Sequence, residues 1–363
     1  MFRDKKEEAE YKVTIAIPTI DRIGLLREAL QSVRLQTYKN FEVVLSDNAA
    51  DERCARELKA LVAEFDDLEI HVFHQKDQLS ASKHAAFMTE AGSAPLWLYL
   101  PDDDLLEPKC LERFVGVLKN NPEAGLVFSD HHIIWEDGSL NNNTDSSSAL
   151  YGRKDLQEGM LRAGDLYHYA LLQTIPLQAS LYRRDILQKL NFESVHPRVP
   201  DFELLFRLHQ ISPEVRVAYC KDRLVAYRIH GAQFTHNEKT LLIHQANVEI
   251  LKRYPPTEER FRTAYEKKLQ DALLVMSFAQ AVQGERLEAN QALLEALKIN
   301  PREVKVWARA IAHQLPKNML STLQEAVSDK RGSTGILRAR RLANRLARKM
   351  TNQKSSARKL GAS

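Results

Sequence analysis

Short apolar runs alternate with stretches of helical periodicity along the first 130 residues of the chain. Runs rich in β-branched and aromatic residues, the pattern of buried strands, occupy residues 13–18, 41–45, 69–74, 96–100 and 125–129. Between them, apolar residues recur at helical spacing over residues 24–35, 54–65, 79–91 and 111–120. This alternation predicts an α/β fold in which helices flank both faces of a mostly parallel sheet.

The pattern changes in the rest of the chain. Residues 137–149 are polar and predict a flexible surface loop, followed by a helix–strand–helix stretch over 167–190, a helix over 199–208 and one or two strands over 216–229. After residue 237 only helical patterns remain, at 239–253, 258–283, 286–299 and 303–313. We therefore predict a sheet domain over residues 11–236, a helical region over 237–328 and a tail over 329–363.

Polar residues stand directly behind several of the predicted strands. Pro18 ends the first strand, Asp47 follows the second, and three aspartates at 102–104 follow the fourth. The carboxyl ends of parallel strands meet at one edge of a sheet, which is where ligands bind. Adjacent carboxylates repel one another, and a divalent cation such as Mg²⁺ or Mn²⁺ is the simplest compensation. The alternative is a solvated turn that caps a helix with Pro108 in its first turn.

Three segments together carry a family resemblance. VTIAIPTIDR, FEVVLSDNAADE and LWLYLPDDDLLEP occur in this order, and their motifs and spacing resemble family 2 glycosyltransferases of the GT-A fold, of the bacterial surface-polysaccharide type. The resemblance covers residues 11–236. It implies an inverting hexosyltransferase-like enzyme (EC 2.4) that moves a sugar from a nucleotide-diphosphate sugar to the hydroxyl of a saccharide or lipid-linked saccharide.

The same resemblance implies a nucleotide site at the ends of the first two strands. Pro18, Thr19 and Asp21 would line the base pocket, and Asp47 would contact the base or the ribose. From the residues alone, Asp21 can also cap the helix that follows it. Asp47 has the alternative of a turn residue beside Asn48.

The aspartate run resembles the family's DxD element, with Pro101 standing where the pattern has its first acidic residue. By the resemblance, Asp102 faces the ribose or the metal, Asp103 is the principal metal ligand, and Asp104 supports it. A bound cation would offset the negative charge that develops on a nucleoside diphosphate leaving group. Lys83 stands where the family often has a basic residue facing the diphosphate, and its alternative is a lysine on a helix surface.

Two later segments resemble the acceptor side of the family. In VPDFELLFRL, Asp201 takes the position of the general base, with Pro200 in place of the usual acidic partner. Glu203 is the alternative base, and a simple helix N-cap is the alternative role for Asp201. In LVAYRIHGAQFTH, His230 would ligate the metal or bond a phosphate oxygen, and its alternative is a structural histidine.

Composition fits a globular protein without a membrane span. Of the 363 residues, 44% are hydrophobic and 28% are charged. No apolar run approaches the roughly 20 residues that a spanning helix needs, and the charged N-terminus has no secretory apolar region. Cys54, Cys110 and Cys220 match no zinc or CxxC spacing, so we expect reduced thiols and a cytoplasmic protein.

The net charge of +4 conceals a basic tail. From Lys330 onward there are eleven Lys or Arg and no Asp or Glu, so the preceding residues carry −7. On a helix, residues 336–350 would be apolar on one side and basic on the other, which favours peripheral binding to the inner, anionic face of the cell membrane. The alternatives are a disordered tail or a helix that docks on another subunit. No aromatic platform or nucleic-acid motif accompanies the charge, so nucleic-acid binding is not predicted.

Two other functions stay open on the sequence. A nucleotidyltransferase can share the fold and the carboxylates, but PTIDRIGLL lacks the glycine-rich, basic loop that we would expect after the first strand. A non-catalytic scaffold, with a degenerate sheet domain and functional C-terminal helices, would be recognised by the absence of nucleotide binding.

Overall fold

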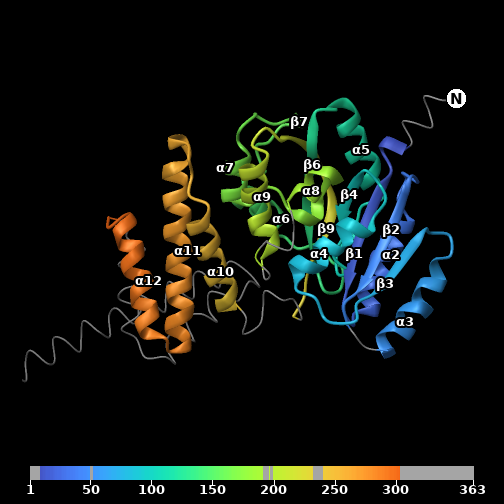
Figure 1. Ribbon diagram of the computed structural model, residues 1–363, viewed down its shortest axis with the longest axis horizontal. Helices are drawn as coiled ribbons and strands as arrows, with labels where there is room; N and C mark the ends of the chain where they lie inside the picture. Colours follow the sequence, from blue (N-terminus) through green and yellow to red (C-terminus); the bar gives the residue numbers. More distant parts are fainter. Residues whose placement is uncertain (1–8, 50–51, 191–195, 197–198, 232–239, 303–363) are drawn as a thin grey trace, which may run out of the picture. The chain divides into compact units, whose positions relative to one another are not determined.

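The computed structural model describes residues 9–49, 52–190, 196, 199–231 and 240–302 (Figure 1). The chain divides into two compact units, residues 1–265 and 266–363. The three-part organisation expected from the sequence stays a prediction. The predicted helix at 303–313 and the basic tail lie outside the described residues.

The first unit is built on one mixed sheet with the strand order β3-β2-β1-β4-β8-β6-β9-β5, and β7 pairs with β9 beside this path. Four parallel strands form its first half: β1 (Val13–Thr19), β2 (Phe41–Asp47), β3 (Ile70–His74) and β4 (Leu96–Tyr99). The second half contains β5 (Leu105–Leu106), β6 (Ala124–Trp135), β7 (Gly159–Met160), β8 (Ser180–Arg183) and β9 (Arg216–Ile229). The mostly parallel α/β fold predicted from the sequence is confirmed, with β8 antiparallel to both of its neighbours.

Helices lie on both faces of this sheet. The helices are α2 (Ile23–Arg34), α3 (Glu52–Val62), α4 (Ala81–Ala91), α5 (Cys110–Asn120), α6 (Thr144–Leu150), α7 (Leu166–Leu172), α8 (Arg184–Lys189), α9 (Pro200–Ile211) and α10 (Thr240–Arg253). The apolar sides of α2, α3 and α5 join one core with alternate residues of β1, such as Val13 and Ile15. Helix α4 packs against β1 and β2 from the other face and also contacts α8.

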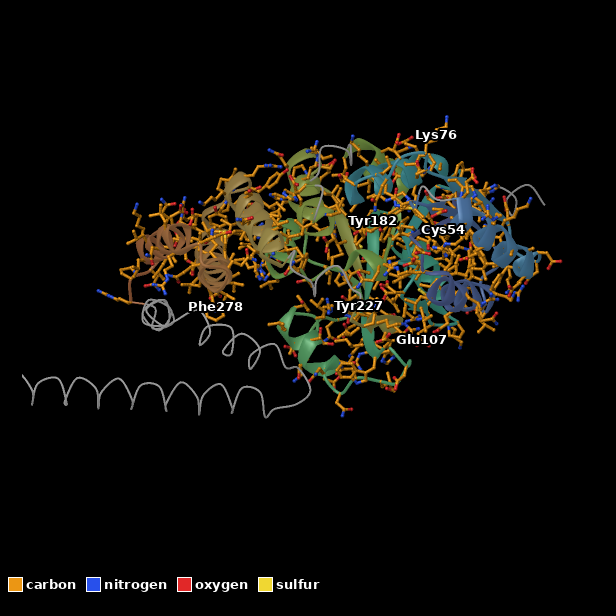
Figure 2. The ribbon with its side chains drawn as sticks, turned by 90° about the horizontal axis from the view of Figure 1, so that it is seen from below. Cys54, Lys76, Glu107, Tyr182, Tyr227 and Phe278 are labelled. Carbon is orange, nitrogen blue, oxygen red and sulfur yellow. The ribbon has the colours of Figure 1, made fainter. Side chains whose placement is uncertain are left out.

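The period-two pattern of the strands explains this core. Ile15 and Ile17 on β1 are fully buried and belong to the same cluster as Leu26 and Leu30, which stand one turn apart on α2. Full burial of such a side chain stabilises the fold by about 2 kcal/mol. On β8, Tyr182, labelled in Figure 2, is fully buried beside Trp97 of the neighbouring strand.

One predicted loop is wrong in part. The polar stretch 137–149 contains α6, because its polar side chains find buried partners that local composition does not reveal. Thr144 Oγ1 accepts the backbone N–H of Ile133 at 3.1 Å, and Ser148 Oγ donates to the carboxylate of Asp130. These bonds attach the helix to β6.

A predicted helix cap is also wrong. Helix α2 has Arg22 at its N-cap position and no side-chain cap. Asp21 has a positive φ of 49°, and its carboxylate accepts hydrogen bonds from Arg53 Nη2 at 2.9 Å and Cys54 Sγ at 3.3 Å. The carboxylate is therefore bonded to the first turn of α3 and does not cap α2.

The second unit contains most of α11 (Arg262–Gln283) and all of α12 (Arg286–Ile299). The amide of Gln270 donates to the carbonyls of Ala296 and Asn300, at 2.8 and 2.9 Å, and so joins the two helices. Among the described residues, no helix combines the length and apolar character needed to cross a membrane.

Candidate active site

The carboxyl ends of β1, β2 and β4 meet, as the sequence predicts. Thr19 is the last residue of β1 and stands in register with Asp47 at the end of β2. Thr19 Oγ1 donates to Asp102 Oδ2 at 2.7 Å, just beyond β4. The strand ends thus bring together polar groups separated by more than 80 residues of sequence.

Asp102 is completely buried and only partly compensated. Arg22 Nη2 lies 2.6 Å from Asp102 Oδ1, and Arg22 Nε donates to Oδ2 at 3.2 Å. Burial raises the pKa of Asp102 to about 6, although Arg22 and Thr19 favour the ionised form. Desolvation therefore outweighs the hydrogen bonds that this carboxylate receives.

Asp103 is the member of the aspartate run that solvent reaches, with its side chain 12% exposed. Its Oδ2 accepts a hydrogen bond from Arg22 Nη1 at 2.8 Å and lies 3.0 Å from His230 Nε2. His230 comes from beyond the end of β9, 127 residues later in the chain. The structure thus brings together Asp103 and His230, two of the residues expected at the metal site.

Asp104 is fully buried and bonded to β9. Its Oδ1 accepts the backbone N–H of Arg228 at 2.9 Å, and its own N–H donates to the carbonyl of Pro101 at 3.1 Å. In the described part of the chain its Oδ2 is buried without a hydrogen-bond partner. Burial and the nearby charge of Asp103 raise the pKa of Asp104 well above its ordinary value. This oxygen therefore retains the capacity to bind a proton or a cation.

The alternative of a solvated capping turn does not fit this geometry. Asp102 and Asp104 are both inaccessible to solvent. The following helix, α5, has Lys109 at its N-cap, with no side-chain cap. The aspartate run therefore does not serve the helix that follows it.

A divalent cation fits the donor set. Asp103 offers a carboxylate oxygen and His230 an imidazole nitrogen 3.0 Å away, whereas no third carboxylate or histidine joins them in a compact ligand group among the described residues. Mg²⁺ is typically held in proteins by one or two carboxylates, with phosphate oxygens and water completing the shell, and Mn²⁺ also accepts oxygen ligands. Such a site would need few ligands from the chain itself.

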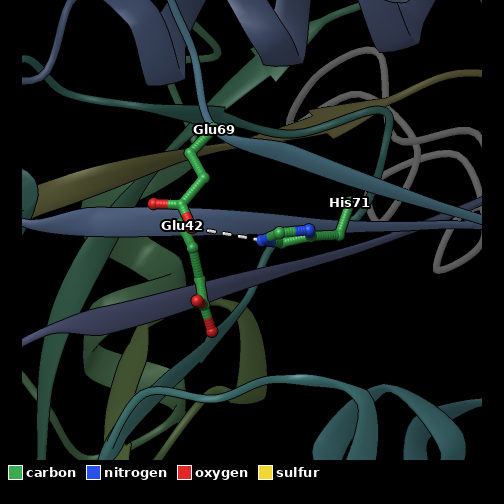
Figure 3. A group of neighbouring side chains, drawn as sticks. All are labelled: Glu42, Glu69 and His71. Atoms are coloured by element: carbon green, nitrogen blue, oxygen red, sulfur yellow. Dashed lines mark hydrogen bonds and ion pairs between the residues drawn. The ribbon is translucent and has the colours of Figure 1, made fainter.

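Two groups of three potential ligands do lie close together among the described residues: Glu42, Glu69 and His71 (Figure 3), and Glu158, Cys220 and Asp222. A side-chain cation already serves each of them. Lys12 Nζ lies 3.0 and 3.2 Å from the two glutamates of the first group. Arg113 pairs with both carboxylates of the second group, at 2.9 and 2.5 Å. Each pair of carboxylates therefore shares one cationic side chain of the protein.

Asp201 lies in the first turn of α9, where Pro200 occupies the first helical position. The N-cap is Val199, so the alternative of Asp201 as the N-cap is wrong. Asp201 is exposed to solvent, yet the surrounding protein raises its pKa by desolvation. A solvent-accessible carboxylate with a raised pKa can exchange protons with a ligand more readily than an ordinary surface aspartate.

Tyr99 connects Asp201 with the aspartate run. This half-buried tyrosine ends β4, and its pKa is raised by burial and then by the negative charges of Asp102, Asp201 and Asp103. Its phenol therefore lies close enough to both ends of the candidate site to feel their charges. Tyr99 was not predicted as a site residue, although its position two residues before Pro101 and the aspartates indicates that it lies close to them.

Glu203, the alternative base, has another role in the structure. Its carboxylate is fully buried, and Oε1 accepts bonds from Arg253 Nη1 at 2.8 Å and Tyr254 Oη at 2.7 Å. Its Oε2 accepts the backbone N–H of His196 at 2.5 Å. Oε1 is thus engaged with the end of α10 and Oε2 with His196, which leaves neither oxygen available for an acceptor hydroxyl.

The predicted nucleotide residues are only partly brought together. Asp47 is buried, with Oδ1 accepting the N–H of Ala49 at 2.9 Å and Oδ2 lying 3.3 Å from His74 Nδ1. The first contact is that of a turn residue, and the second adds a partner from the end of β3. Pro18 is half-buried and in register with Ser46.

Asp21 and Lys83 are not bonded to this group. Asp21 is exposed, and its bonds to Arg53 and Cys54 lower its pKa. Lys83 is exposed in the first turn of α4, where its backbone N–H donates to Ser80 Oγ at 3.4 Å. The guanidinium that bonds the carboxylates of Asp102 and Asp103 is that of Arg22, which stands next to Asp21 in the segment PTIDR and was missed.

The sheet region is similar to known proteins. Residues 14–190 match the model of the family described as Glycosyl transferase family 2. Asp201 and His230 lie beyond the matched residues. Uncharacterized glycosyltransferases of Nostoc sp. and Rickettsia prowazekii are each 24% identical to this chain, over 61% and 62% of its length. Each alignment spans 66% of the relative's own length.

Solved structures share the fold. S. aureus TarS 1–349 in complex with UDP-GlcNAc superposes with a TM-score of 0.59 at 12% identity, over 88% of this chain and 93% of that one. The mannosyltransferase PcManGT from Pyrobaculum calidifontis, in complex with GDP-Man and Mn²⁺, gives a TM-score of 0.50 at 14% identity, over 88% and 87% of the two chains. The GT-A fold expected from the sequence is thereby confirmed.

Proposed function

Because residues 14–190 match the model of glycosyl transferase family 2, we propose that the chain transfers a sugar, with inversion, from a nucleotide-diphosphate sugar to an acceptor hydroxyl in the synthesis of a cell-surface polysaccharide. The acceptor oxygen forms a bond to the anomeric carbon while the bond to the diphosphate oxygen breaks. A single displacement of this kind inverts the carbon. It needs three things from the protein: a donor site, charge compensation for the leaving group, and a base.

The donor site in this proposal is the edge formed by β1, β2 and β4. Pro18, Thr19 and Asp21 would line the pocket of the base, Asp47 would bind base or ribose, and Asp102 would bind the ribose. Two observations support it: Thr19 bonds Asp102, and it stands in register with Asp47. The related folds of TarS and PcManGT were solved with UDP-GlcNAc and GDP-Man, which supports a nucleotide-sugar donor without selecting the base.

Charge on the leaving diphosphate needs a cation. In the proposal Asp103 and His230 hold Mn²⁺ or Mg²⁺, Asp104 supports them, and the bound ion offsets the negative charge that develops on the diphosphate. The Mn²⁺ of PcManGT supports this assignment. Lys83 and Arg22 would add positive charge on the same side. Arg22 is the better placed of the two, because it already contacts both Asp102 and Asp103.

Asp201 is the proposed general base. It would take the proton of the acceptor hydroxyl as that oxygen attacks. Its raised pKa brings it closer to the operating pH, which improves general-base catalysis. The engaged carboxylate of Glu203 leaves Asp201 as the better candidate in this helix.

The acceptor and the location are part of the same proposal. An acceptor that is a saccharide or a lipid-linked saccharide would suit an enzyme held at the inner face of the cell membrane. Residues 336–350, which lie outside the described residues, would supply that contact through their basic and apolar sides. Flotation with anionic liposomes, with and without residues 330–363, tests it: equal flotation of both forms would contradict the anchor.

The observation that carries the proposal is the meeting of Asp103 and His230 at 3.0 Å, next to a carboxylate that bonds the end of β1. The test is a panel of UDP-, GDP- and dTDP-sugars with Mn²⁺, in which donor turnover is followed before and after Asp103→Ala. Metal-dependent turnover that the substitution removes supports the site. Turnover that survives Asp103→Ala contradicts the metal assignment, and failure to bind any nucleotide would favour a scaffold.

A further inference from the structure

Arg228 is a buried arginine next to the aspartate run. It lies near the end of β9, is 1% exposed, and precedes His230 by two residues. β9 pairs with β5 through Leu105 and Ala226. This pairing places Arg228, two residues further along β9, next to the turn that contains Asp103 and Asp104. The backbone and the guanidinium of this residue both contact that turn.

The contacts of Arg228 with the turn fix one peptide. Its backbone N–H donates to Asp104 Oδ1 at 2.9 Å, and its Nε donates to the main-chain carbonyl of Asp103 at 3.0 Å. His230 then approaches the carboxylate of the same Asp103 at 3.0 Å. The end of β9 therefore contacts both the main chain and the side chain of Asp103.

The far side of the guanidinium is anchored elsewhere. Nη1 donates to the carbonyl of Glu136, just past β6, at 2.8 Å, and Nη2 donates to Glu28 Oε2 on α2 at 2.6 Å. The guanidinium is a rigid planar fork, so anchoring Nη1 and Nη2 fixes the direction of Nε. The Glu28 side chain is 54% exposed, so this buried contact has one end at the surface.

We propose that Arg228 is a positioning residue, which orients the Asp103 carboxylate toward its divalent cation, and that Glu28 anchors Arg228 in that orientation. The inference rests on the proposed function, because it needs Asp103 to bind the cation. Arg228 itself would not touch the donor, since its guanidinium is directed at Asp103, Glu136 and Glu28. A buried cation is costly to keep, and replacing such groups by apolar ones is often neutral for stability, so a role in orienting a ligand gives a reason for its presence.

The proposal predicts that Glu28, a residue with an exposed side chain, affects metal-dependent binding. Loss of Glu28 removes one anchor of the guanidinium, which loosens the fork and lets the Asp103 peptide rotate. Groups that orient a metal ligand typically change metal affinity about 10- to 100-fold when they are removed. Glu28 acts on Asp103 only through Arg228, so its removal is expected to change metal affinity less, by about 3- to 10-fold.

The experiment measures the affinity of UDP and of GDP by calorimetry, each with and without Mn²⁺, together with the melting temperature. Glu28→Ala should weaken Mn²⁺-dependent binding about 3- to 10-fold and leave the metal-free affinity unchanged. Glu28→Gln keeps an acceptor for Nη2 and should recover most of the loss. Arg228→Lys, which cannot reach the three acceptors together, should lose at least about 10-fold. Glu64→Ala is the matched control. Glu64 lies outside α2, is exposed to about the same extent as Glu28, and pairs with Arg27, which precedes Glu28 on α2.

The outcomes separate the positioning role from the proposed function. If Asp103→Ala loses Mn²⁺-dependent binding while Glu28→Ala matches Glu64→Ala, the positioning role is overturned and the metal site stands. If Asp103→Ala binds both diphosphates with Mn²⁺ as the parent does, the metal site itself fails. A fall in melting temperature with unchanged metal dependence would make Glu28 and Arg228 purely structural. Should Arg228→Lys fail to fold, the pair of Glu28 variants still decides.

Discussion

Two buried carboxylates at opposite ends of the same parallel strands have opposite environments. Glu42 lies near the start of β2, and it is only 2% exposed. It accepts hydrogen bonds from Lys12 Nζ, Thr14 Oγ1, Ser93 N and Oγ, and Ala94 N, at 2.6 to 3.1 Å. These donors hold the pKa of Glu42 at about 2 despite its burial.

Asp102, at the other end of the sheet, is equally buried but has fewer donors. Thr19 and Arg22 bond it, and its pKa is raised to about 6. Asp104 keeps one oxygen without a partner in the described part of the chain. Burial alone therefore does not distinguish the two ends. A carboxylate that holds the fold together is saturated by donors from the protein, whereas a carboxylate kept for a ligand retains acceptor capacity.

The largest effect is expected at Asp201. Asp201→Asn removes the proposed base and keeps the shape of the side chain, so kcat should fall by roughly 10³-fold with little change in the donor KM. Initial rates with the active donor from the panel measure it. The comparison would break if the variant kept more than a tenth of the activity, because Asp201 would then be an ordinary first-turn residue of α9.

Asp103→Asn should have the next largest effect. Loss of its charge weakens the hold on the cation, so kcat/KM should fall by about 10²- to 10³-fold, and excess Mn²⁺ should restore part of it. The melting temperature should stay close to that of the parent, since Asp103 is the one partly exposed member of the run. A large loss of stability would instead place Asp103 in the same class as Glu42.

The sequence predicted the site residues at the strand ends better than it predicted the arginines that contact them. The positions of Asp47 and of residues 102–104 follow from short-range patterns, because an apolar strand that ends in a polar residue is visible locally. Arg22 was missed, and the role of Arg228 was not predicted, because they depend on contacts across 80 and 125 residues. Nothing local separates them from surface arginines.

The same limit explains the errors in local structure. The stretch 137–149 was taken as a loop because its composition is polar, but Thr144 and Ser148 are buried against β6. Glu42 looks like an ordinary polar position in FEVVL, and its saturation by Ser93 and Ala94 arises only when β2 meets the end of α4. Patterns locate elements, whereas the donors of a buried carboxylate come from the tertiary fold.

Glu42→Gln tests the structural end of the comparison. The amide cannot accept all the bonds that the carboxylate accepts, and its NH₂ group would face donors, so unfolding free energy should fall by about 2 kcal/mol. Chemical denaturation measures this value. Activity per folded molecule should match the parent; a selective loss of kcat would show that Glu42 contributes to the site.

Acidification should reduce the difference in unfolding free energy between the parent and Glu42→Gln. The pKa of Glu42 is lowered from 4.5 to about 2 in the folded protein, so its contribution is fully present above about pH 4.5 and is lost as pH falls toward 2. Denaturation of parent and Glu42→Gln at pH 7 and at pH 3 should therefore show a smaller gap at the lower pH. A gap that is independent of pH would mean that the charge of Glu42 is unimportant.

The smallest effect is expected at Lys83. Its size tests whether the ligand-binding end of the sheet extends as far as α4. Lys83 is exposed on α4, and an exposed ion pair with a diphosphate contributes about 1 kcal/mol or less, so Lys83→Ala should reduce donor affinity by no more than about fivefold. The loss should shrink further as salt is raised, because such pairs are screened. Lys76→Ala is the control, because Lys76 is an exposed lysine in the loop between β3 and α4. A loss of tenfold or more, insensitive to salt, would mean that Lys83 becomes buried against the donor, and the ligand-binding end would then extend from the aspartates to α4.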